Sequence, residues 1–220
     1  MSLIYQARHM FLDGTLATVQ ITLFSAILAL AMAFAAGLGR LSRHRPVRAA
    51  ALLYVELFRG VALIIQLFWL FFVLPFFGIE LEPVTTATIG LGLCNGAYGA
   101  EIVRAAVQAV PRGQLDAAIA LNYTRVQRLV RIVLPQAIPA MIPPFGNLSI
   151  ELLKATALVS LITIQDLSFQ ALTLRQTTMR TAEPFAVVLV VYFVLAMAIT
   201  FAFRLLERRL GHGLDRGGLR

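Results

Sequence analysis

Residues 14–39 read GTLATVQITLFSAILALAMAFAAGLG and contain no charged side chain. A helix needs about 20 predominantly apolar residues to cross a hydrocarbon core about 30 Å thick. The run is long enough for this, and it lacks the alternation over about 10 residues that marks a strand of an outer-membrane barrel. The stretch therefore predicts an α-helix that spans a membrane.

The composition of the whole chain agrees with this interpretation. Of its 220 residues, 59% are hydrophobic and 14% are charged, whereas a soluble chain is about 45–50% apolar and about 25% charged. These values exclude a soluble enzyme, a disordered protein and a disulfide scaffold. The single cysteine, Cys94, and three widely separated histidines offer neither a disulfide framework nor the spacing of metal ligands. We therefore expect no metal site and no catalytic residue.

Five membrane spans are expected along the chain. They are residues 15–39, 50–76, 84–108, 136–164 and 184–206. No soluble domain is visible, so residues 1–220 are interpreted as one all-α membrane domain. The fourth span joins two apolar runs, and Pro139, Pro143 and Pro144 could bend or break it. The first span could instead be a cleaved signal peptide, but its length and the arginines that follow it favour a retained helix.

The distribution of basic residues predicts the orientation. Most of the 19 lie between spans one and two, between spans three and four, or in the C-terminal tail: Arg40, Arg43, Arg45, Arg48, Arg112, Arg125, Arg128, Arg131, Arg204, Arg208, Arg209, Arg216 and Arg220. The opposite side carries Arg8, Arg175 and Arg180. Cytoplasmic loops are enriched in Lys and Arg, so we expect the N-terminus outside the cell and the C-terminus in the cytoplasm.

Six charged residues fall within the predicted spans, as three pairs with the same spacing. These are Glu56–Arg59, Glu101–Arg104 and Glu151–Lys154. Residues three apart share a helix face, so each acid can pair with its base and lower the cost of a charge in the membrane. We interpret the first two pairs as structural. The third lies deeper and contains the only lysine of the chain, and both a structural and a translocation-pathway role remain open for it.

The loop 109–135 contains signals for helix ends and helix starts that a simple connector between spans does not need. Residues Gln114–Leu121 form a predicted helix, which Asn122 can end because asparagine tolerates the left-handed conformation. The sequence from Thr124 to Gln127 fits a capping box that starts a second helix, about 125–134, running to Pro135. The predicted helix–turn–helix elbow either lies on the lipid surface or docks a cytoplasmic partner. Spacing alone does not separate these two interpretations.

The loop also carries a family resemblance. DAAIALN (116–122) followed by RIVLPQA (131–137) resembles the EAA loop of permease subunits of binding-protein-dependent ABC importers. Asp116, Ala117 and Ala118 stand for Glu-Ala-Ala, Asn122 takes the glycine position, and Leu134–Pro135 close the motif. The resemblance implies that these residues couple the permease to an ATPase. Both departures are chemically mild, since a carboxylate is kept and asparagine can still make the turn.

The resemblance extends over about residues 14 to 207. YVELFRG (54–60), GAYGAEIVRAAVQAVPRGQ (96–114), PPFGN (143–147) and ELLKATALVS (151–160) look like the polar-amino-acid branch of this family. Val61–Ala62 departs from that branch, which usually has Thr-Pro there. The stretch KATAL (154–158), together with the loop, looks most like permeases for ectoine and hydroxyectoine.

The resemblance implies a type I ABC importer permease of the bacterial inner membrane that moves a polar amino acid or a compatible solute. It also implies a second permease chain, an external substrate-binding protein and an ATPase subunit. The sequence itself has no phosphate-binding P-loop, because its sole lysine is followed by Ala155. We therefore expect no cofactor in this chain, with ATP and Mg²⁺ bound by the ATPase.

Two other functions are weighed against this one. An ion-coupled secondary transporter or channel could use Glu56, Glu101 or Glu151, but the chain is short and lacks inverted repeats. A nucleic-acid binder could use the basic tail, but that tail lacks the interleaved aromatic residues of a stacking surface. We therefore expect the lipid bilayer, and no nucleic acid, among the partners.

Overall fold

The computed structural model describes residues 8–211, and every regular element in that range is helical. The α-helices are α2 Arg8–Gly39, α3 Arg45–Gly60, α4 Leu63–Phe68, α5 Pro83–Gln108, α6 Arg112–Ala120, α7 Arg125–Arg128, α8 Leu134–Ala155, α9 Leu167–Thr178 and α10 Ala182–Gly211. Short π or 3-10 segments are η1 Trp69–Val73, η2 Leu74–Phe77, η3 Leu129–Val133 and η4 Thr156–Ile162. The predicted all-α class is confirmed for this range, while Arg216 and Arg220 lie outside the described residues.

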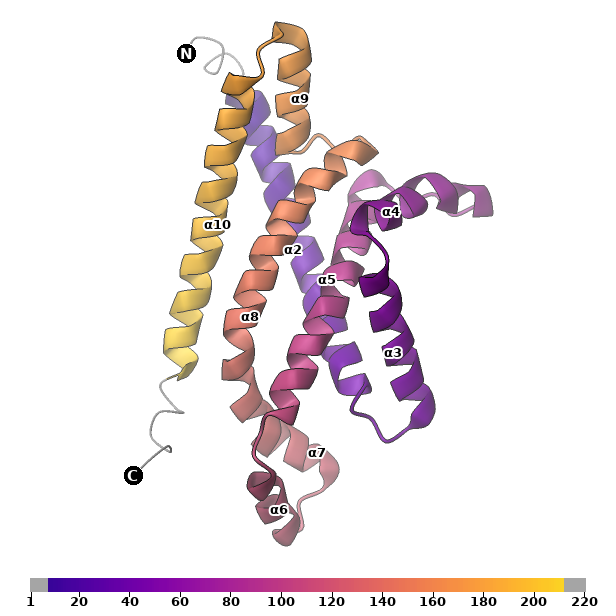
Figure 1. The fold of residues 1–220 in the computed structure, drawn as a ribbon, viewed down its shortest axis with the longest axis vertical. Coiled ribbons are helices and arrows are strands. Elements are labelled where there is room, and N and C mark those ends of the chain that lie inside the picture. The colour runs from indigo at the N-terminus through magenta and orange to yellow at the C-terminus, as the bar shows by residue number, and fades with distance from the viewer. Residues whose placement is uncertain (1–7, 212–220) are drawn as a thin grey trace.

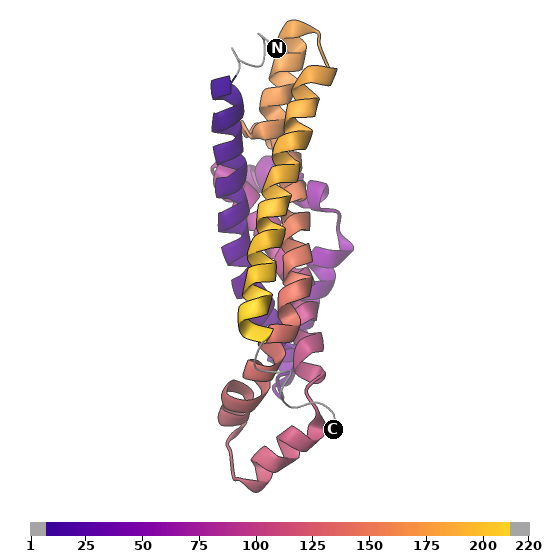
Figure 2. The same cartoon turned by 90° about the vertical axis from the view of Figure 1, so that its left-hand side faces the viewer.

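The long helices α2, α5, α8 and α10 form an elongated bundle (Figures 1 and 2). Both views place α6 and α7 at one end of the bundle and α9 at the other, beside the start of α2 and of α10. The elements that the sequence assigns to opposite sides of a membrane therefore lie at opposite ends of the molecule.

The centre of the bundle is the close contact between α2 and α5. A Cβ atom added at Gly37 would lie 2.7 Å from the Cβ of Val103, and one added at Gly99 would lie 2.7 Å from the Cβ of Ala33. Only glycine permits so close an approach, which is how small residues allow membrane helices to pack. Ala33, Ala100 and Val103 are fully buried at this contact.

Three helical stretches are long and apolar enough to cross a membrane. They are Arg8–Gly39, Arg125–Ile162 and Ala182–Leu210, and the bent pair Arg45–Gly60 with Leu63–Phe77 makes a fourth if it is one span. The predicted span 84–108 corresponds to α5, which is not among these stretches. α5 is rich in small and polar residues, such as Gly92, which packs against Leu28 of α2, and the buried Asn95, so it is less apolar than a lipid-facing span. The five-span prediction thus stays a prediction.

The predicted second span, 50–76, is not one continuous helix. Val61 and Ala62 have extended backbones, and the two arms on either side of them meet at 103°. A break frees carbonyl groups that need hydrogen-bond donors inside a membrane. The Nε2 of Gln66 supplies two of these bonds, donating to the carbonyl oxygens of Phe58 at 2.9 Å and Val61 at 2.8 Å.

The predicted fourth span is continuous, because α8 passes through all three prolines without a break. The chain in fact stays helical from Arg125 to Ile162, so the second elbow helix does not end at Pro135 as predicted. Proline has no N–H to donate, and the turn before Pro135 widens to a π segment, in which the N–H of Leu134 donates to the carbonyl of Leu129. This widening carries the elbow helix into the span.

Helix α9 was not predicted. Asp166 caps its first turn, with Oδ1 accepting from the N–H of Phe169 at 2.9 Å and Oδ2 accepting from the N–H of Ser168 at 3.1 Å. The N–H of Leu167 donates to Thr18 Oγ1 on α2 at 3.2 Å. These bonds fix α9 across the end of the bundle.

Candidate functional site

The elbow between α6 and α7 ends its first helix as the sequence predicts. Asn122 has φ 57°, its N–H donates to the carbonyl of Ile119 at 2.9 Å, and the N–H of Tyr123 donates to the carbonyl of Ala118 at 3.0 Å. This pair of bonds is the Schellman motif, in which a left-handed residue closes a helix. The left-handed end at Asn122 is confirmed.

The second elbow helix starts at the predicted capping box. Thr124 Oγ1 accepts from the N–H of Gln127 at 3.3 Å, and Gln127 Oε1 accepts from the N–H of Thr124 at 2.8 Å. Hydrogen bonds thus fix both the end of α6 and the start of α7, on either side of the turn.

One side of the elbow packs on the bundle and the other is open. Val110, Leu115 and Val133 pack in a cluster that includes Met141 of α8. Four other apolar side chains are each more than half exposed: Ile119, Leu121, Val126 and Val130. Asp116, Ala117, Asn122 and Pro135 are also exposed, whereas Ala118 is buried and Leu134 is half-buried. The elbow therefore presents an apolar knob with an acidic residue beside it.

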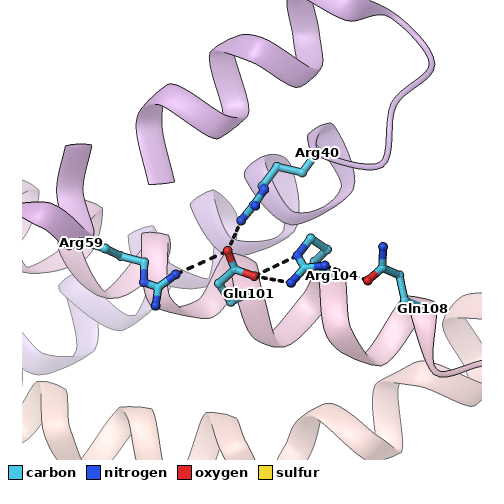
Figure 3. A network of polar contacts seen from close by, with 5 residues as sticks. All are labelled: Arg40, Arg59, Glu101, Arg104 and Gln108. Carbon is cyan, nitrogen blue, oxygen red and sulfur yellow. Dashed lines mark hydrogen bonds and ion pairs between the residues drawn. The ribbon is translucent and has the colours of Figure 1, made fainter. Parts of the chain in front are cut away.

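A second group of charged residues surrounds Glu101 on α5 (Figure 3). Its Oε1 accepts from Arg40, just after α2, and lies 3.4 Å from Nη1 of Arg59 at the end of α3. Its Oε2 accepts from Nε of Arg104 and lies 2.8 Å from Nη2 of the same residue. Arg104 also donates to Oε1 of Gln108 at 2.7 Å. One carboxylate thereby ties together the ends of three helices.

The structure forms one of the three predicted acid–base contacts. Glu101 pairs with Arg104, but no ion pair joins Glu56 to Arg59 or Glu151 to Lys154. Arg59 turns to Glu101 and to the ring of Tyr98, 5.3 Å from its centroid, because the break after Gly60 places the end of α3 against α5. Glu56, Glu151 and Lys154 are exposed.

A polar cavity lies at the break between α3 and α4. It has a volume of about 300 Å³, and we call it the transit pocket. Its lining residues are Arg59, Gly60, Val61, Ala62, Leu63, Cys94, Asn95, Tyr98, Glu151 and Ala155. The pocket brings Glu151 of α8 and Arg59 of α3 to one cavity, while Lys154 is not part of its lining. Asn95 and Tyr98 were missed by the sequence analysis, and their signal was polarity within an apolar span.

A family model described as the binding-protein-dependent transport system inner membrane component matches residues 15–212. The chain belongs to this family. Membership makes it a non-catalytic membrane subunit of a transport system, located in the inner membrane, and confirms these two predictions. It also implies an external binding protein and an ATPase as partners.

Several proteins similar to this chain are named as permeases or transporters of amino acids. A probable amino-acid ABC transporter permease of Sinorhizobium fredii is 46% identical over 200 residues, covering 88% of this chain and 84% of the relative. The L-cystine transport system permease of Bacillus subtilis is 33% identical over 201 residues, with 90% and 85% covered. A crystal structure of an amino acid ABC transporter with histidines superposes with a TM-score of 0.87 at 32% identity, covering 94% of this chain and 96% of the other.

These comparisons confirm the predicted importer permease fold for this family member. The alternative of an ion-coupled secondary transporter or channel does not fit a component of a binding-protein-dependent system. Ectoine appears in none of the three names, so that substrate stays a prediction.

Proposed function

We propose that this chain is the permease subunit of an amino-acid importer and that the substrate crosses through the transit pocket. The observation that carries the proposal is the meeting of Arg59 and Glu151, of opposite charge, in one cavity that also contains Tyr98. An amino acid has both charges: its carboxylate suits a guanidinium fork, and its ammonium suits a carboxylate and an aromatic face. The relatives named for amino acids and for L-cystine support the same substrate class.

The same chemistry admits the predicted ectoine or hydroxyectoine, because these solutes are zwitterions too. The transit pocket is lined by one acid and one base, so its charges do not distinguish one zwitterionic substrate from another. Much of the selection is then made by the external binding protein before the substrate reaches this chain.

The elbow is proposed as the ATPase contact. The elbow lies at the end of the molecule opposite α9 (Figure 2). A partner that covers its exposed apolar side chains would remove apolar surface from water. Asp116, Ala117, Ala118 and Asn122 form the first helix and turn of this contact, and Leu134–Pro135 connect it to α8. Movement of the ATPase would thus act directly on a helix that lines the transit pocket.

The proposed assembly contains two permease chains, two ATPase subunits that bind ATP and Mg²⁺, and one external binding protein. In each permease five segments cross the bilayer, with the bent α3–α4 pair and the buried α5 as two of them. The positive-inside rule supports an outer N-terminus and a cytoplasmic C-terminus, with the elbow in the cytoplasm.

The test is uptake of a labelled amino acid by proteoliposomes that contain the permease, its ATPase and its binding protein. Glu151→Gln removes the acid of the transit pocket and is expected to lower uptake at least tenfold, while ATPase activity persists. Glu56→Gln is the matched control, because Glu56 is an exposed acid that does not line the pocket. Equal uptake by Glu151→Gln and the control would contradict the proposed path.

A further inference from the structure

The turn from α2 into α3 lies at the end of the bundle nearer to the elbow (Figure 1). Residues of this turn, of α3 and of α5 line a second, strongly basic cavity. It has a volume of about 500 Å³, and we call it the basic pocket. Its lining residues are Arg40, Leu41, Arg45, Arg48, Ala49, Leu52, Arg104 and Gln108. Four of these eight are arginines and none is acidic, so the pocket attracts an anion.

Within the described part of the chain, acidic residues balance only part of the positive charge of the basic pocket. Glu101 is shared by Arg40, Arg104 and Arg59. No described carboxylate forms an ion pair with Arg45 or Arg48. Burial, and after it the charge of Arg104, lower the pKa of Arg40, while the charge of Glu56 acts in the opposite direction. An anion in the pocket would relieve this repulsion.

Phosphate is the anion that several guanidinium groups recognise best, because each can donate two parallel hydrogen bonds to its oxygens. Arg45 and Arg48, at the start of α3, can thus contact a phosphate without any change in the Glu101 contacts, and Arg40 and Arg104 add positive charge beside it.

The rim of the basic pocket is apolar. Leu41 and Leu52 line it and remain 36% and 43% exposed, and the neighbouring Leu53 on α3 is 68% exposed. A free phosphate would leave this apolar surface exposed to water, whereas an acyl chain attached to a phosphate can cover it. Basic pockets between helices at a membrane surface are known to suit anionic headgroups.

We propose that the basic pocket binds the phosphate of an anionic phospholipid headgroup, with the lipid's acyl chains along the exposed leucines of α3. The lipid would tie the α2–α3 turn to α5 at the end nearer to the elbow. Arg45 and Arg48 are its primary contacts, because neither is used by Glu101.

The experiment measures thermal unfolding of the full chain in a neutral detergent, titrated with phosphatidylglycerol or with phosphatidylcholine of identical acyl chains. Phosphatidylglycerol is expected to raise the midpoint by several degrees and phosphatidylcholine to leave it unchanged. The double variant Arg45→Gln/Arg48→Gln should require about 10- to 30-fold more phosphatidylglycerol for the same shift, at roughly a factor of five per lost charge.

Arg43→Gln is the matched control, because Arg43 is an exposed arginine of the same turn that does not line the pocket. It should respond to phosphatidylglycerol within about twofold of the unchanged protein, since it contributes no contact. If the control and the double variant lost the same amount of phosphatidylglycerol response, the effect would be general charge attraction. That result would overturn the proposed binding site. Equal stabilisation by soluble glycerol phosphate would overturn the lipid as occupant.

Native mass spectra of the unchanged protein provide a test that needs no variant. Phosphatidylglycerol should remain bound after collisional activation that removes phosphatidylcholine. Equal retention of the two lipids would overturn the proposal, even if the double variant did not fold.

Discussion

Replacing Glu101 with glutamine removes the carboxylate that Arg40, Arg59 and Arg104 share. Breaking a fully buried ion pair from one side costs about 3–5 kcal/mol, because the remaining charge is left uncompensated. Here Glu101 keeps 24% of its side chain exposed and Arg40 keeps 16%. Solvent screening therefore reduces the loss, and we expect about 2–3 kcal/mol of unfolding free energy.

A double-mutant cycle identifies the cause of this loss. If the loss comes from uncompensated arginines, Arg40→Gln should cost less in the Glu101→Gln background than alone, with a coupling of about 1 kcal/mol or more. The assay is denaturant unfolding of the purified chain in detergent, followed by the fluorescence of Trp69. Glu80→Gln, which removes an exposed acid between η2 and α5, is the control and should change stability by less than about 0.5 kcal/mol.

Two results would refute this reasoning about the Glu101 group. One is a Glu101→Gln variant as stable as the unchanged protein, which would mean that the arginines need no partner. The other is strict additivity of the two substitutions, which would mean that the contacts are formed independently.

Three further predictions concern other parts of the fold. Burial raises the pKa of Asp166 to about 6 from 3.8. Between these pH values the folded state binds more protons than the unfolded state. The free energy of unfolding should therefore fall as the pH rises from about 4 to 6, by at most about 3 kcal/mol. Unfolding of Asp166→Asn, which keeps a capping oxygen, should lose this dependence, and an unchanged pH profile would contradict the assignment. Gly37→Leu should prevent α2 from packing on α5 and abolish a monodisperse peak in size-exclusion chromatography, whereas Gly60→Leu, with open space at its Cβ, should keep it. Gln66→Leu should destabilise the α3–α4 break by about 1–3 kcal/mol in denaturant unfolding, because the Val61 carbonyl loses its side-chain donor and the Phe58 carbonyl keeps only the weak Cys94 thiol. An unchanged unfolding midpoint would contradict this prediction.

Local signals in the sequence were sufficient to predict part of this structure. The apolar runs at 15–39 and 184–206 predict α2 and α10 because a lipid-facing helix must be apolar along its length. The turn at Asn122 and the box at Thr124 are predicted because their hydrogen bonds join residues within five positions. The elbow is therefore the best-predicted part of the candidate site.

Long-range contacts explain what was missed. The break at Val61–Ala62 depends on Gln66 reaching back to carbonyls of α3, and no periodicity of the sequence shows this. Spacing pairs Arg59 with Glu56, but the bend turns Arg59 to Glu101 on another helix. The transit pocket likewise joins residues that are far apart in the sequence, such as Arg59 and Glu151.

In the proposed mechanism, the elbow transmits the action of the ATPase to the helices of this chain. Replacing Asn122 with valine tests it most directly, because a β-branched residue is strained at φ 57° and distorts the turn while leaving the spans intact. Asn122→Gly is the control, since glycine adopts this conformation freely. The measurement is ATPase activity stimulated by the substrate-loaded binding protein, in the reconstituted complex. We expect stimulation to be lost in Asn122→Val and kept in Asn122→Gly, and full stimulation in a well-inserted Asn122→Val complex would contradict the account.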